Sequence, residues 1–312
     1  MKARNPRVSI GLPVFNGERY LAGALNCLLQ QDYEDFELII SDNASTDATE
    51  SICREYAAKD PRIRYYRNAT NIGASPNYNR VFRLARGEFF KWASHDDECH
   101  SSLVRRCLEV FEQAAASAVL VYSMAEIIDE VGRVMFQSPD RISSSSARPF
   151  KRLATVLLSS YWAHPLWGLI RSDALRRTRL MGCIETDHVV LSELALLGEL
   201  IEIPEVLHRV RQHPGNAIPT HPSARELLAW FDPTRGNDWI FLPYRERVYI
   251  EYLKGIWHMP LSASERVLCF CTVPAVCYWR RFLNWSRPVR QRLGLRRKRS
   301  HQPSHTLPAA GL

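Results

Sequence analysis

Four polar clusters contain the residues whose types and spacing could do chemistry, and each cluster directly follows a predicted strand. They occupy residues 13–18 (PVFNGE), 42–47 (DNASTD), 68–73 (NATNIG) and 96–97 (DD). In parallel α/β sheets, ligands bind beyond the carboxyl ends of the strands, so the clusters are expected to meet at one edge. Turns alone need Gly, Asn or Asp, but they do not need carboxylates from successive strands at that edge. The pattern therefore predicts a ligand site there.

The acidic residues of these clusters suit a nucleotide diphosphate that is bridged by a metal ion. Asp96 and Asp97 supply hard oxygen ligands suited to Mg²⁺ or Mn²⁺, and such an ion acts as a Lewis acid on a leaving diphosphate. An unpaired Asp42 carboxylate can accept a hydrogen bond from the ring N–H of uracil, thymine or guanine. The alternative for Asp96 and Asp97 is a solvated N-cap for a helix beginning near Ser101. A helix cap would not explain why Asp42 and Asp47 are expected at the same edge of the sheet as Asp96 and Asp97.

Alternating strands and helices are predicted to position these clusters, which is typical of a mostly parallel sheet with crossover helices. Apolar runs predict buried strands at residues 8–12, 36–41, 62–67, 88–93 and 118–122. Helical periodicity predicts helices at residues 17–31, 47–58, 78–85 and 103–115. Asp47 and Glu50 have capping-box spacing at the start of the second helix.

The second half of the chain is predicted to complete this domain and then to become helical. A hairpin turn is expected at 129–132, and four consecutive serines indicate a mobile linker or active-site loop at 138–149. A helix at 153–158, a strand at 166–170 and a helix at 189–197 follow. The predicted domains are residues 1–215 (donor half about 7–125, acceptor half about 150–215), a helical extension at 216–290 and a basic, disordered tail at 291–312.

Composition favours a protein without a membrane-spanning helix. No apolar run approaches the roughly 20 residues that cross a bilayer, and the charged start lacks a signal-peptide core, so we expect a cytoplasmic location. The eight cysteines lack C-x-x-C spacing and are expected to be reduced thiols.

The net charge of +8 is concentrated near the carboxyl end of the sequence. Nine basic residues lie between Arg280 and Arg299, and no acid follows Glu265. With the apolar, aromatic residues 267–279 before it, this run is typical of an amphipathic segment on an anionic membrane surface, here the inner face of the cytoplasmic membrane. A solvated tail is the alternative. Nucleic acid is not an expected partner, because no recognition module accompanies the run.

Residues 8–111 resemble glycosyltransferase family 2, the inverting enzymes with the GT-A fold, and a looser likeness continues to about His213. The matching motifs are P-x-F-N-x-E at 13–18, D-N-x-S-x-D at 42–47, N-x-G at 71–73 and the double aspartate at 96–97. The resemblance implies an α/β fold with a mostly parallel central sheet flanked by helices, and with a helical carboxyl-terminal extension. Many members read D-x-D-D where this chain has Ser94-His95-Asp96-Asp97, so the first carboxylate of that pattern is absent.

The resemblance also implies residue roles on the donor side. Asp96 is placed by the ribose and diphosphate, Asp97 is the metal ligand with Asp96 beside it, and Asp47 mainly shapes its loop. The ion is Mg²⁺ or Mn²⁺. The residues expected to bind the donor are Pro13, Val14, Phe15, Asn16, Glu18, Asp42, Asn43, Asn71, Gly73 and Asp96.

The acceptor side requires a general base within hydrogen-bond reach of the acceptor hydroxyl. The resemblance places an acid before a second-half helix, where Asp187 is favoured and Glu185 is the alternative. Asp187 as a simple helix cap also remains open. Arg211 and His213 resemble a basic loop that closes over the diphosphate and contacts phosphate oxygens. An exposed basic loop is the other interpretation.

These observations predict an inverting glycosyltransferase. Its donor would be a nucleotide-diphospho-sugar, UDP- or dTDP-linked, and its acceptor an unidentified saccharide or lipid-linked molecule in surface polysaccharide or glycolipid biosynthesis. One alternative is a nucleotidyltransferase, which needs a Gly-rich loop with a basic residue after the first strand, and residues 13–18 contain no such loop. The other is a non-catalytic protein that binds nucleotide-sugars.

Overall fold

The computed structural model describes residues 5–182, 186–215, 224–235 and 244–292. Its centre is one nine-stranded sheet in the order β3-β2-β1-β4-β8-β6-β9-β5, with β7 paired to β6. The strands are β1 (Val8–Val14), β2 (Phe36–Asp42), β3 (Ile63–Arg67), β4 (Phe89–Trp92), β5 (Glu98–Cys99), β6 (Ala118–Ile128), β7 (Val134–Gln137), β8 (Leu169–Arg171) and β9 (Glu199–Arg211).

Six of these strands run in the same direction, which confirms the mostly parallel sheet. β1 is parallel to β2 and β4, and β2 is parallel to β3. β8 is antiparallel to both β4 and β6, so β6 points the same way as β4, and β9 is parallel to β6. The carboxyl ends of β1, β2, β3, β4, β6 and β9 therefore share one edge, where parallel sheets place their ligands.

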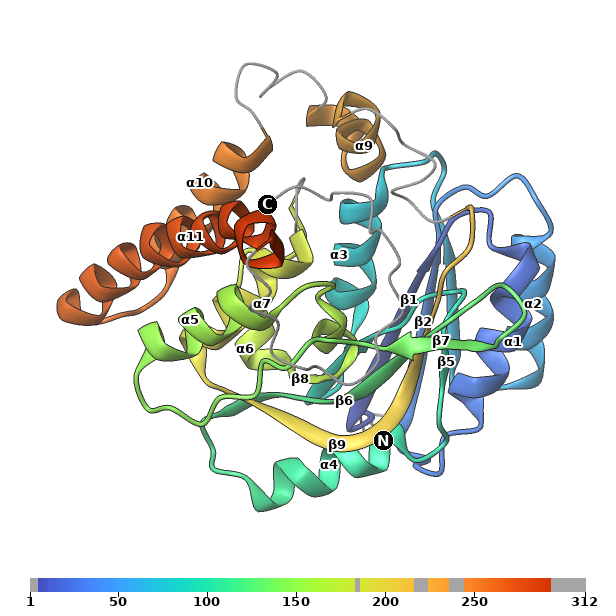
Figure 1. Cartoon of the computed structure of the whole chain (residues 1–312). Helices are drawn as coiled ribbons and strands as arrows, with labels where there is room; N and C mark the ends of the chain where they lie inside the picture. Colours follow the sequence, from blue (N-terminus) through green and yellow to red (C-terminus); the bar gives the residue numbers. More distant parts are fainter. Residues whose placement is uncertain (1–4, 183–185, 216–223, 236–243, 293–312) are drawn as a thin grey trace.

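Helices cover both faces of the sheet, because the first strands are apolar on both sides (Figure 1). One core joins Ile10 and Leu12 of β1 to α1 and α4. The other joins Phe90 and Trp92 of β4 to α3, α5 and α7. The helices involved are α1 (Glu18–Leu29), α2 (Thr49–Lys59), α3 (Ala74–Leu84), α4 (Leu103–Gln113), α5 (Pro149–Ser159), α6 (Ser172–Arg176) and α7 (Thr186–Leu197).

Two expectations for the second half are wrong. Residues 166–170 do not form one strand: a 3-10 turn, η1 (His164–Trp167), comes first and β8 begins at Leu169, because Pro165 suits a helical first turn. Residues 138–149 are expected to form a mobile linker or an active-site loop, but the part around Asp140 is packed into the domain. Asp140 is buried and accepts the backbone N–H groups of Tyr161 at 2.6 Å and His164 at 3.0 Å.

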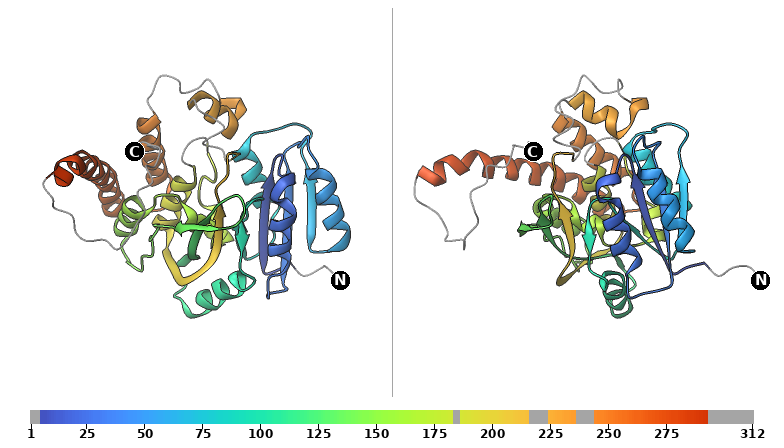
Figure 2. Two further views of the ribbon diagram at one scale, coloured as in Figure 1. Left: turned by 45° about the vertical axis from the view of Figure 1, so that its right-hand side comes forward. Right: turned by 90° about the vertical axis from the view of Figure 1, so that its right-hand side faces the viewer.

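The carboxyl-terminal helices pack on the same body. They are α9 (Ala224–Phe231), the short η2 (Pro233–Arg235), α10 (Tyr244–His258) and α11 (Ala263–Arg292). A third core joins α10 and α11 to α5 and α7. Figure 2 shows α11 at the margin of the molecule, with its later part projecting from the body. Among the described residues, no helix is both long and apolar enough to span a bilayer. The predicted tail from 293 onward, and Glu185, lie outside the described residues.

Candidate active site

A cleft of about 840 Å³ opens at the shared edge of the sheet. The loops after β1, β2, β3, β4 and β9 all contribute to its wall, and α9 and η2 contribute Ala229, Trp230 and Pro233. Of the residues expected to bind the donor, those that line the cleft are Pro13, Val14, Phe15, Asn16, Asn43, Asn71, Asp96 and His213. The cleft therefore brings together residues separated by up to 220 positions in the sequence, from Pro13 to Pro233.

The first two loops hold each other by reciprocal hydrogen bonds. The backbone N–H of Asn16 donates to Ser45 Oγ at 2.9 Å, and Asn16 Oδ1 accepts the N–H of Thr46 at 2.8 Å. Asp47 accepts the N–H of Glu18 at 3.0 Å, and Glu18 accepts the N–H of Ala48 at 2.9 Å. Asp47 thus accepts a backbone N–H at the start of α1, and Glu18 accepts one at the start of α2. Such N–H groups have no partner within their own helix.

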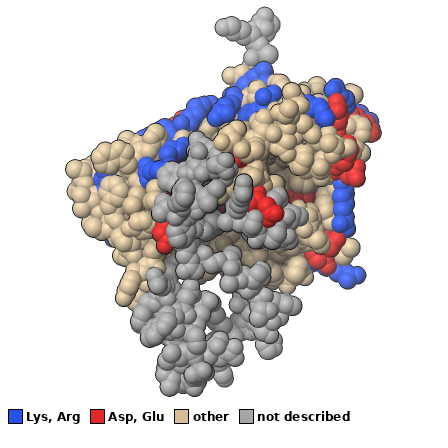
Figure 3. All heavy atoms as spheres, turned by 90° about the horizontal axis from the view of Figure 1, so that it is seen from above, with Lys and Arg blue, Asp and Glu red and all other residues tan. Residues whose placement is uncertain are grey.

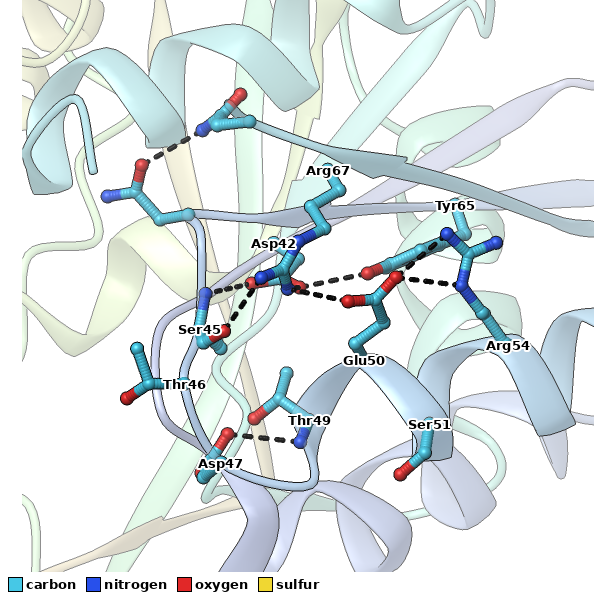
Figure 4. A network of polar contacts seen from close by, with 12 residues as sticks. Asp42, Ser45, Thr46, Asp47, Thr49, Glu50, Ser51, Arg54, Tyr65 and Arg67 are labelled. Carbon is cyan, nitrogen blue, oxygen red and sulfur yellow. Dashed lines mark hydrogen bonds and ion pairs between the residues drawn. The ribbon is translucent and has the colours of Figure 1, made fainter. Parts of the chain in front are cut away.

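Asp47 and Glu18 therefore act on loop shape rather than on the cleft. Asp47 also accepts the N–H of Thr49 at 3.0 Å. Burial opposes its ionisation, but the hydrogen bonds from Thr49 and Glu18 outweigh it, so the pKa of Asp47 lies below its ordinary value. The capping-box expectation is wrong for Glu50, which pairs with Arg54 and Arg67 instead (Figure 4).

Asp42 is buried and fully paired, so the expectation of an unpaired carboxylate is wrong. Its Oδ2 accepts hydrogen bonds from Arg67 at 2.5 Å and from the Tyr65 hydroxyl at 2.8 Å (Figure 4). Its Oδ1 accepts the N–H of Ser45 at 2.8 Å. Because a buried carboxylate is costly unless paired, Arg67 and Tyr65 are needed to keep Asp42 here. Asp42 does not line the cleft and fixes the loop that does.

Asp96 is the carboxylate that faces the cleft. Its Oδ2 lies 3.0 Å from His213 Nε2, and its Oδ1 accepts the Ser94 hydroxyl. His213 Nδ1 accepts the N–H of Gly215 at 3.1 Å, which places the ring proton on Nε2. Burial opposes ionisation of Asp96, but the His213 hydrogen bond and the nearby His95 outweigh it and lower the pKa of Asp96. The cleft therefore holds an ionised carboxylate beside an N–H donor.

Asp97 and Arg211 lie behind Asp96 and do not line the cleft. Asp97 Oδ1 accepts the backbone N–H of Arg211 at 2.9 Å, and its Oδ2 lies 3.2 Å from His208 Nε2. Burial and the charge of Asp96 raise the pKa of Asp97. The Arg211 guanidinium bonds the carbonyls of Asp96 and Asp129 at 2.9 and 3.1 Å and pairs with Glu98. Neither residue therefore offers its charged group to the cleft.

Two further expected residues, Gly73 and Asp187, do not line the cleft. Gly73 has a φ of +88°, and a Cβ there would lie 2.5 Å from Pro233 Cδ, so only glycine suits the packing of η2. Asp187 is the second residue of α7, with its Oδ1 accepting the N–H of His188 at 3.0 Å. Burial opposes its ionisation, but interactions with His188 outweigh it and lower the pKa of Asp187.

The surroundings of Tyr78 connect Asp187 with the cleft. Tyr78 lines the cleft. Burial and then the charges of Asp96, Asp97 and Asp187 raise the pKa of its hydroxyl. Asp96 and Asp187, the expected base, thus both act electrostatically on the Tyr78 hydroxyl.

Sequence reasoning missed several residues that shape the site. Arg67 pairs with Asp42, and His208 lies beside Asp97. The ring of Tyr20 lies 5.0 Å from that of His213. Nothing in the sequence around these residues marks them as partners of a distant acid. Tyr78 follows the third cluster on α3 and could have been found by extending that cluster through the first helical turns.

The amino-terminal part of the chain matches a known family. The family described as glycosyl transferase family 2 matches residues 9–177, more than half of the chain. Chondroitin synthase of Escherichia coli is 33% identical over 132 residues, which are 42% of this chain and 19% of that protein. The chain spans less than half the length of the first curated relatives that it matches, at 42% and 24% for the first two.

Two solved structures share the fold. TarS of S. aureus, in complex with UDP, has a TM-score of 0.53 at 17% identity, covering 86% of this chain and 90% of that one. The mannosyltransferase PcManGT of Pyrobaculum calidifontis, in complex with GDP-Man and Mn²⁺, has a TM-score of 0.52 at 17% identity, covering 94% and 84%. These likenesses confirm the GT-A fold.

The contacts of Arg211 predict that it stabilises the fold rather than binding phosphate. Replacing Arg211 with Ala removes the guanidinium donor of the buried Asp96 carbonyl and the ion pair with Glu98, so the free energy of unfolding should fall by about 3 kcal/mol. Arg209→Ala is the matched control, because its side chain is 48% exposed, and it should stay within about 0.5 kcal/mol. Urea unfolding measures both. If Arg211→Ala left the free energy of unfolding unchanged but abolished UDP binding, Arg211 would be assigned to phosphate binding after all.

Proposed function

The chain belongs to glycosyl transferase family 2, and on this premise we propose that it transfers a sugar from a nucleotide-diphospho-sugar to an acceptor hydroxyl. The observation that carries the proposal is the cleft itself, where an ionised Asp96 and the His213 N–H lie in one cavity with the amides of Asn43 and Asn71. A nucleoside needs neutral hydrogen-bonding groups, and a diphosphate needs a cation and N–H donors. This cleft offers groups of both kinds.

A UDP- or dTDP-linked sugar is the donor that we propose, with the nucleoside near the loops after β1 and β2. Phe15 is 39% exposed at the rim and offers a face for stacking. The names of the solved neighbours agree with a nucleotide in this position, since TarS was solved with UDP and PcManGT with GDP-Man. GDP is therefore the nucleotide to compare with UDP and dTDP.

A divalent cation, Mg²⁺ or Mn²⁺, fits the diphosphate end of the cleft. In the described part of the chain, no three His, Cys, Asp or Glu residues are grouped to hold a metal. Mg²⁺ nevertheless needs only one or two carboxylates when substrate phosphates supply further oxygens. Asp96 would hold the ion, while Asp97 stays behind it. The ion would neutralise charge on the leaving diphosphate, and His213 Nε2–H, which contacts Asp96 in the structure, would be shared between that carboxylate and a phosphate oxygen.

Inversion at the sugar carbon requires a base on the face opposite the leaving diphosphate, and we assign that role to Asp187. The base must be ionised to accept the acceptor's hydroxyl proton. Its lowered pKa keeps Asp187 ionised at neutral pH, whereas both carboxylate oxygens of Asp97 already have partners, the Arg211 N–H and His208. The acceptor oxygen then bonds to the sugar carbon as the bond to the diphosphate oxygen breaks.

The acceptor that we propose is a saccharide or lipid-linked molecule of surface polysaccharide or glycolipid biosynthesis. Chondroitin synthase, which shares part of this sequence, bears a polysaccharide name. The competing proposal is a protein that binds the nucleotide-sugar without turning it over. A nucleotidyltransferase is less well supported, because Asn16 and Glu18 occupy the loop where a triphosphate would need basic groups.

The exposed face of α11 supports peripheral contact with an anionic membrane at the cytoplasmic side. Val267, Cys271, Pro274 and Tyr278 recur at helical spacing and are all exposed, Val267 by 60% and Tyr278 by 75%. The opposite stripe of Cys269, Val273 and Val276 packs into the third core. Residues 267–279 contain no charge, and nine basic residues follow by Arg299. Seen from above, the left side over α11 and α10 is largely uncharged (Figure 3).

Nucleotide binding tests the donor and metal proposals together. Calorimetry with UDP, dTDP and GDP should show binding that Mn²⁺ strengthens, and a ligand at 100 times its Kd should stabilise the fold by about 2.7 kcal/mol. Asp96→Asn should abolish the Mn²⁺ enhancement. Asp173→Asn, an exposed carboxylate of α6, is the control. Mn²⁺ enhancement that survives in Asp96→Asn would contradict the assignment.

Removal of the base should stop turnover without weakening the donor. Asp187→Asn should lower donor hydrolysis and transfer by about 10²- to 10⁴-fold, with the Kd for UDP unchanged. A carboxylate base acts above its pKa, and that of Asp187 lies below its ordinary value, so its titration should not limit the rate between pH 5 and 8. Full activity of Asp187→Asn combined with inactivity of Glu185→Gln would move the base to Glu185.

Vesicle flotation tests the membrane proposal. The full chain should float with vesicles containing phosphatidylserine but not with pure phosphatidylcholine, and added salt should reverse binding because basic groups near the surface contribute about 1 kcal/mol each. Tyr278→Ser with Trp279→Ser should weaken flotation, while Val131→Ser, 71% exposed on the β6–β7 turn, should not. The membrane proposal would be wrong if the chain did not float with either vesicle. If the chain were then a dimer that Tyr278→Ser with Trp279→Ser dissociates, the exposed stripe of α11 would be assigned to contact with a second copy.

A further inference from the structure

Two buried asparagines of α3 contact opposite sides of the proposed site. Asn77 and Asn79 are 2% and 8% exposed, although the helix also buries the apolar Val81 and Phe82. Buried amides are costly unless they are hydrogen bonded. Residues at i and i+2 of a helix do not face the same way, and each of these side chains bonds a different segment of the chain.

Asn77 belongs to an amide network at the nucleoside end. Its Nδ2 donates to the Ser41 carbonyl at 2.8 Å, and its Oδ1 accepts the Ser41 hydroxyl at 2.7 Å and Asn68 Nδ2 at 3.1 Å. Asn68 Nδ2 also donates to Asn43 Oδ1 at 2.9 Å, and Asn43 Nδ2 donates to Asn71 Oδ1 at 2.8 Å. Asn43, Asn71 and Asn77 itself all line the cleft, and the network fixes which way the amides of Asn43 and Asn71 point.

Asn79 instead holds the segment that precedes the proposed base. Its Nδ2 donates to the Met181 carbonyl at 2.8 Å, and its Oδ1 accepts the Met181 N–H at 2.9 Å. These two bonds replace the backbone partners that Met181 would have in a strand. They join α3 to a segment 102 residues later in the chain.

The segment held by Asn79 is strained and is hydrogen bonded to the first residue of α7. Leu180 has a φ of +60°, a conformation that is unfavourable for a residue with a branched side chain. Such a conformation persists only where surrounding contacts impose it. Beyond Met181, the N–H of Gly182 donates to Thr186 Oγ1 at 2.6 Å, and Thr186 is the residue before Asp187.

We propose that α3 positions the two reacting sides of the site separately: Asn77 orients the amides that bind the nucleoside, and Asn79 holds the 180–182 segment and thereby positions Asp187. Both are positioning residues, and the inference rests on the proposed function only where turnover is measured. The observation behind it is that one helix directs two buried amides into two separate hydrogen-bond networks, one around Ser41 and Asn68 and one at Met181.

The test compares Asn77→Ala with Asn79→Ala, and Asn26→Ala serves as matched control because its exposed side chain accepts one distant hydrogen bond, from Tyr56. Asn77→Ala should weaken UDP binding about tenfold, the effect expected for lost hydrogen bonds of a buried amide. Asn79→Ala should leave the Kd for UDP within about twofold but lower donor hydrolysis about tenfold to a hundredfold, because a misplaced base costs rate rather than affinity.

Amide hydrogen exchange gives a readout that needs no activity. Exchange at residues 180–182 and in the first turn of α7 should be faster in Asn79→Ala and unchanged in Asn77→Ala, because only Asn79 holds that segment. Asn79→Asp, which can still accept the Met181 N–H but cannot donate to its carbonyl, should be intermediate. It also replaces Asn79→Ala if that variant does not fold.

The outcomes separate this inference from the proposed function. A wild-type chain that neither binds a nucleotide diphosphate nor hydrolyses a donor contradicts the proposed function, while the exchange comparison still tests the role of Asn79. The other case is a wild-type chain that binds and turns over the donor. If Asn77→Ala and Asn79→Ala then change UDP binding and amide exchange in the same way, the separate positioning is overturned. Unchanged exchange in Asn79→Ala overturns it as well.

Discussion

The site depends on one set of hydrogen bonds, in which the end of β9 holds the aspartate pair. The backbone and guanidinium of Arg211 bond Asp97 and the Asp96 carbonyl, and the guanidinium also reaches the β6–β7 turn. His213, two residues further on, consequently lies 3.0 Å from the Asp96 carboxylate. A strand from the second half of the chain thus completes a site whose other loops come from the first half. The two carboxylates have opposite pKa shifts: burial and the charge of Asp96 raise the pKa of Asp97, whereas His213, His95 and Ser94 outweigh burial and lower the pKa of Asp96.

Charge is distributed unevenly along the cleft, and this follows from what each end can satisfy. The end proposed for the nucleoside is built from buried amides and hydroxyls that hydrogen bond one another, with Asp42 neutralised by Arg67 behind them. Neutral groups can be buried once they are hydrogen bonded, whereas an unpaired charge there would be costly. The end proposed for the diphosphate instead has the Asp96 carboxylate in the wall of the cavity. The proposed cation would bind there with an anionic ligand supplying the remaining oxygens.

Buried polar side chains also connect the parts of the domain that sequence distance separates. α3 reaches the loops after β2 and β3 through Asn77 and the segment before α7 through Asn79. Such bonds are directional, so they fix relative positions more narrowly than apolar packing of the same area does. The carboxyl-terminal helices attach differently, through the apolar stripe of α11 in the third core, and leave a second, uncharged stripe exposed. Large exposed apolar patches commonly mark interaction surfaces.

The sequence by itself determined the parallel α/β architecture, the shared edge and the clusters that meet there. Those features follow from local periodicity and from the rule that ligands bind at the carboxyl ends of parallel strands, so residues 13–17 and Asp96 could be placed at the cleft from the sequence. Only the tertiary structure decided which carboxylates are available. Arg67 saturates Asp42, and His208 and Arg211 enclose Asp97, although each lies 25 to 114 residues from its partner in the sequence. The ionisation and accessibility of a side chain depend on partners that the fold brings close, and spacing along the chain does not encode those partners.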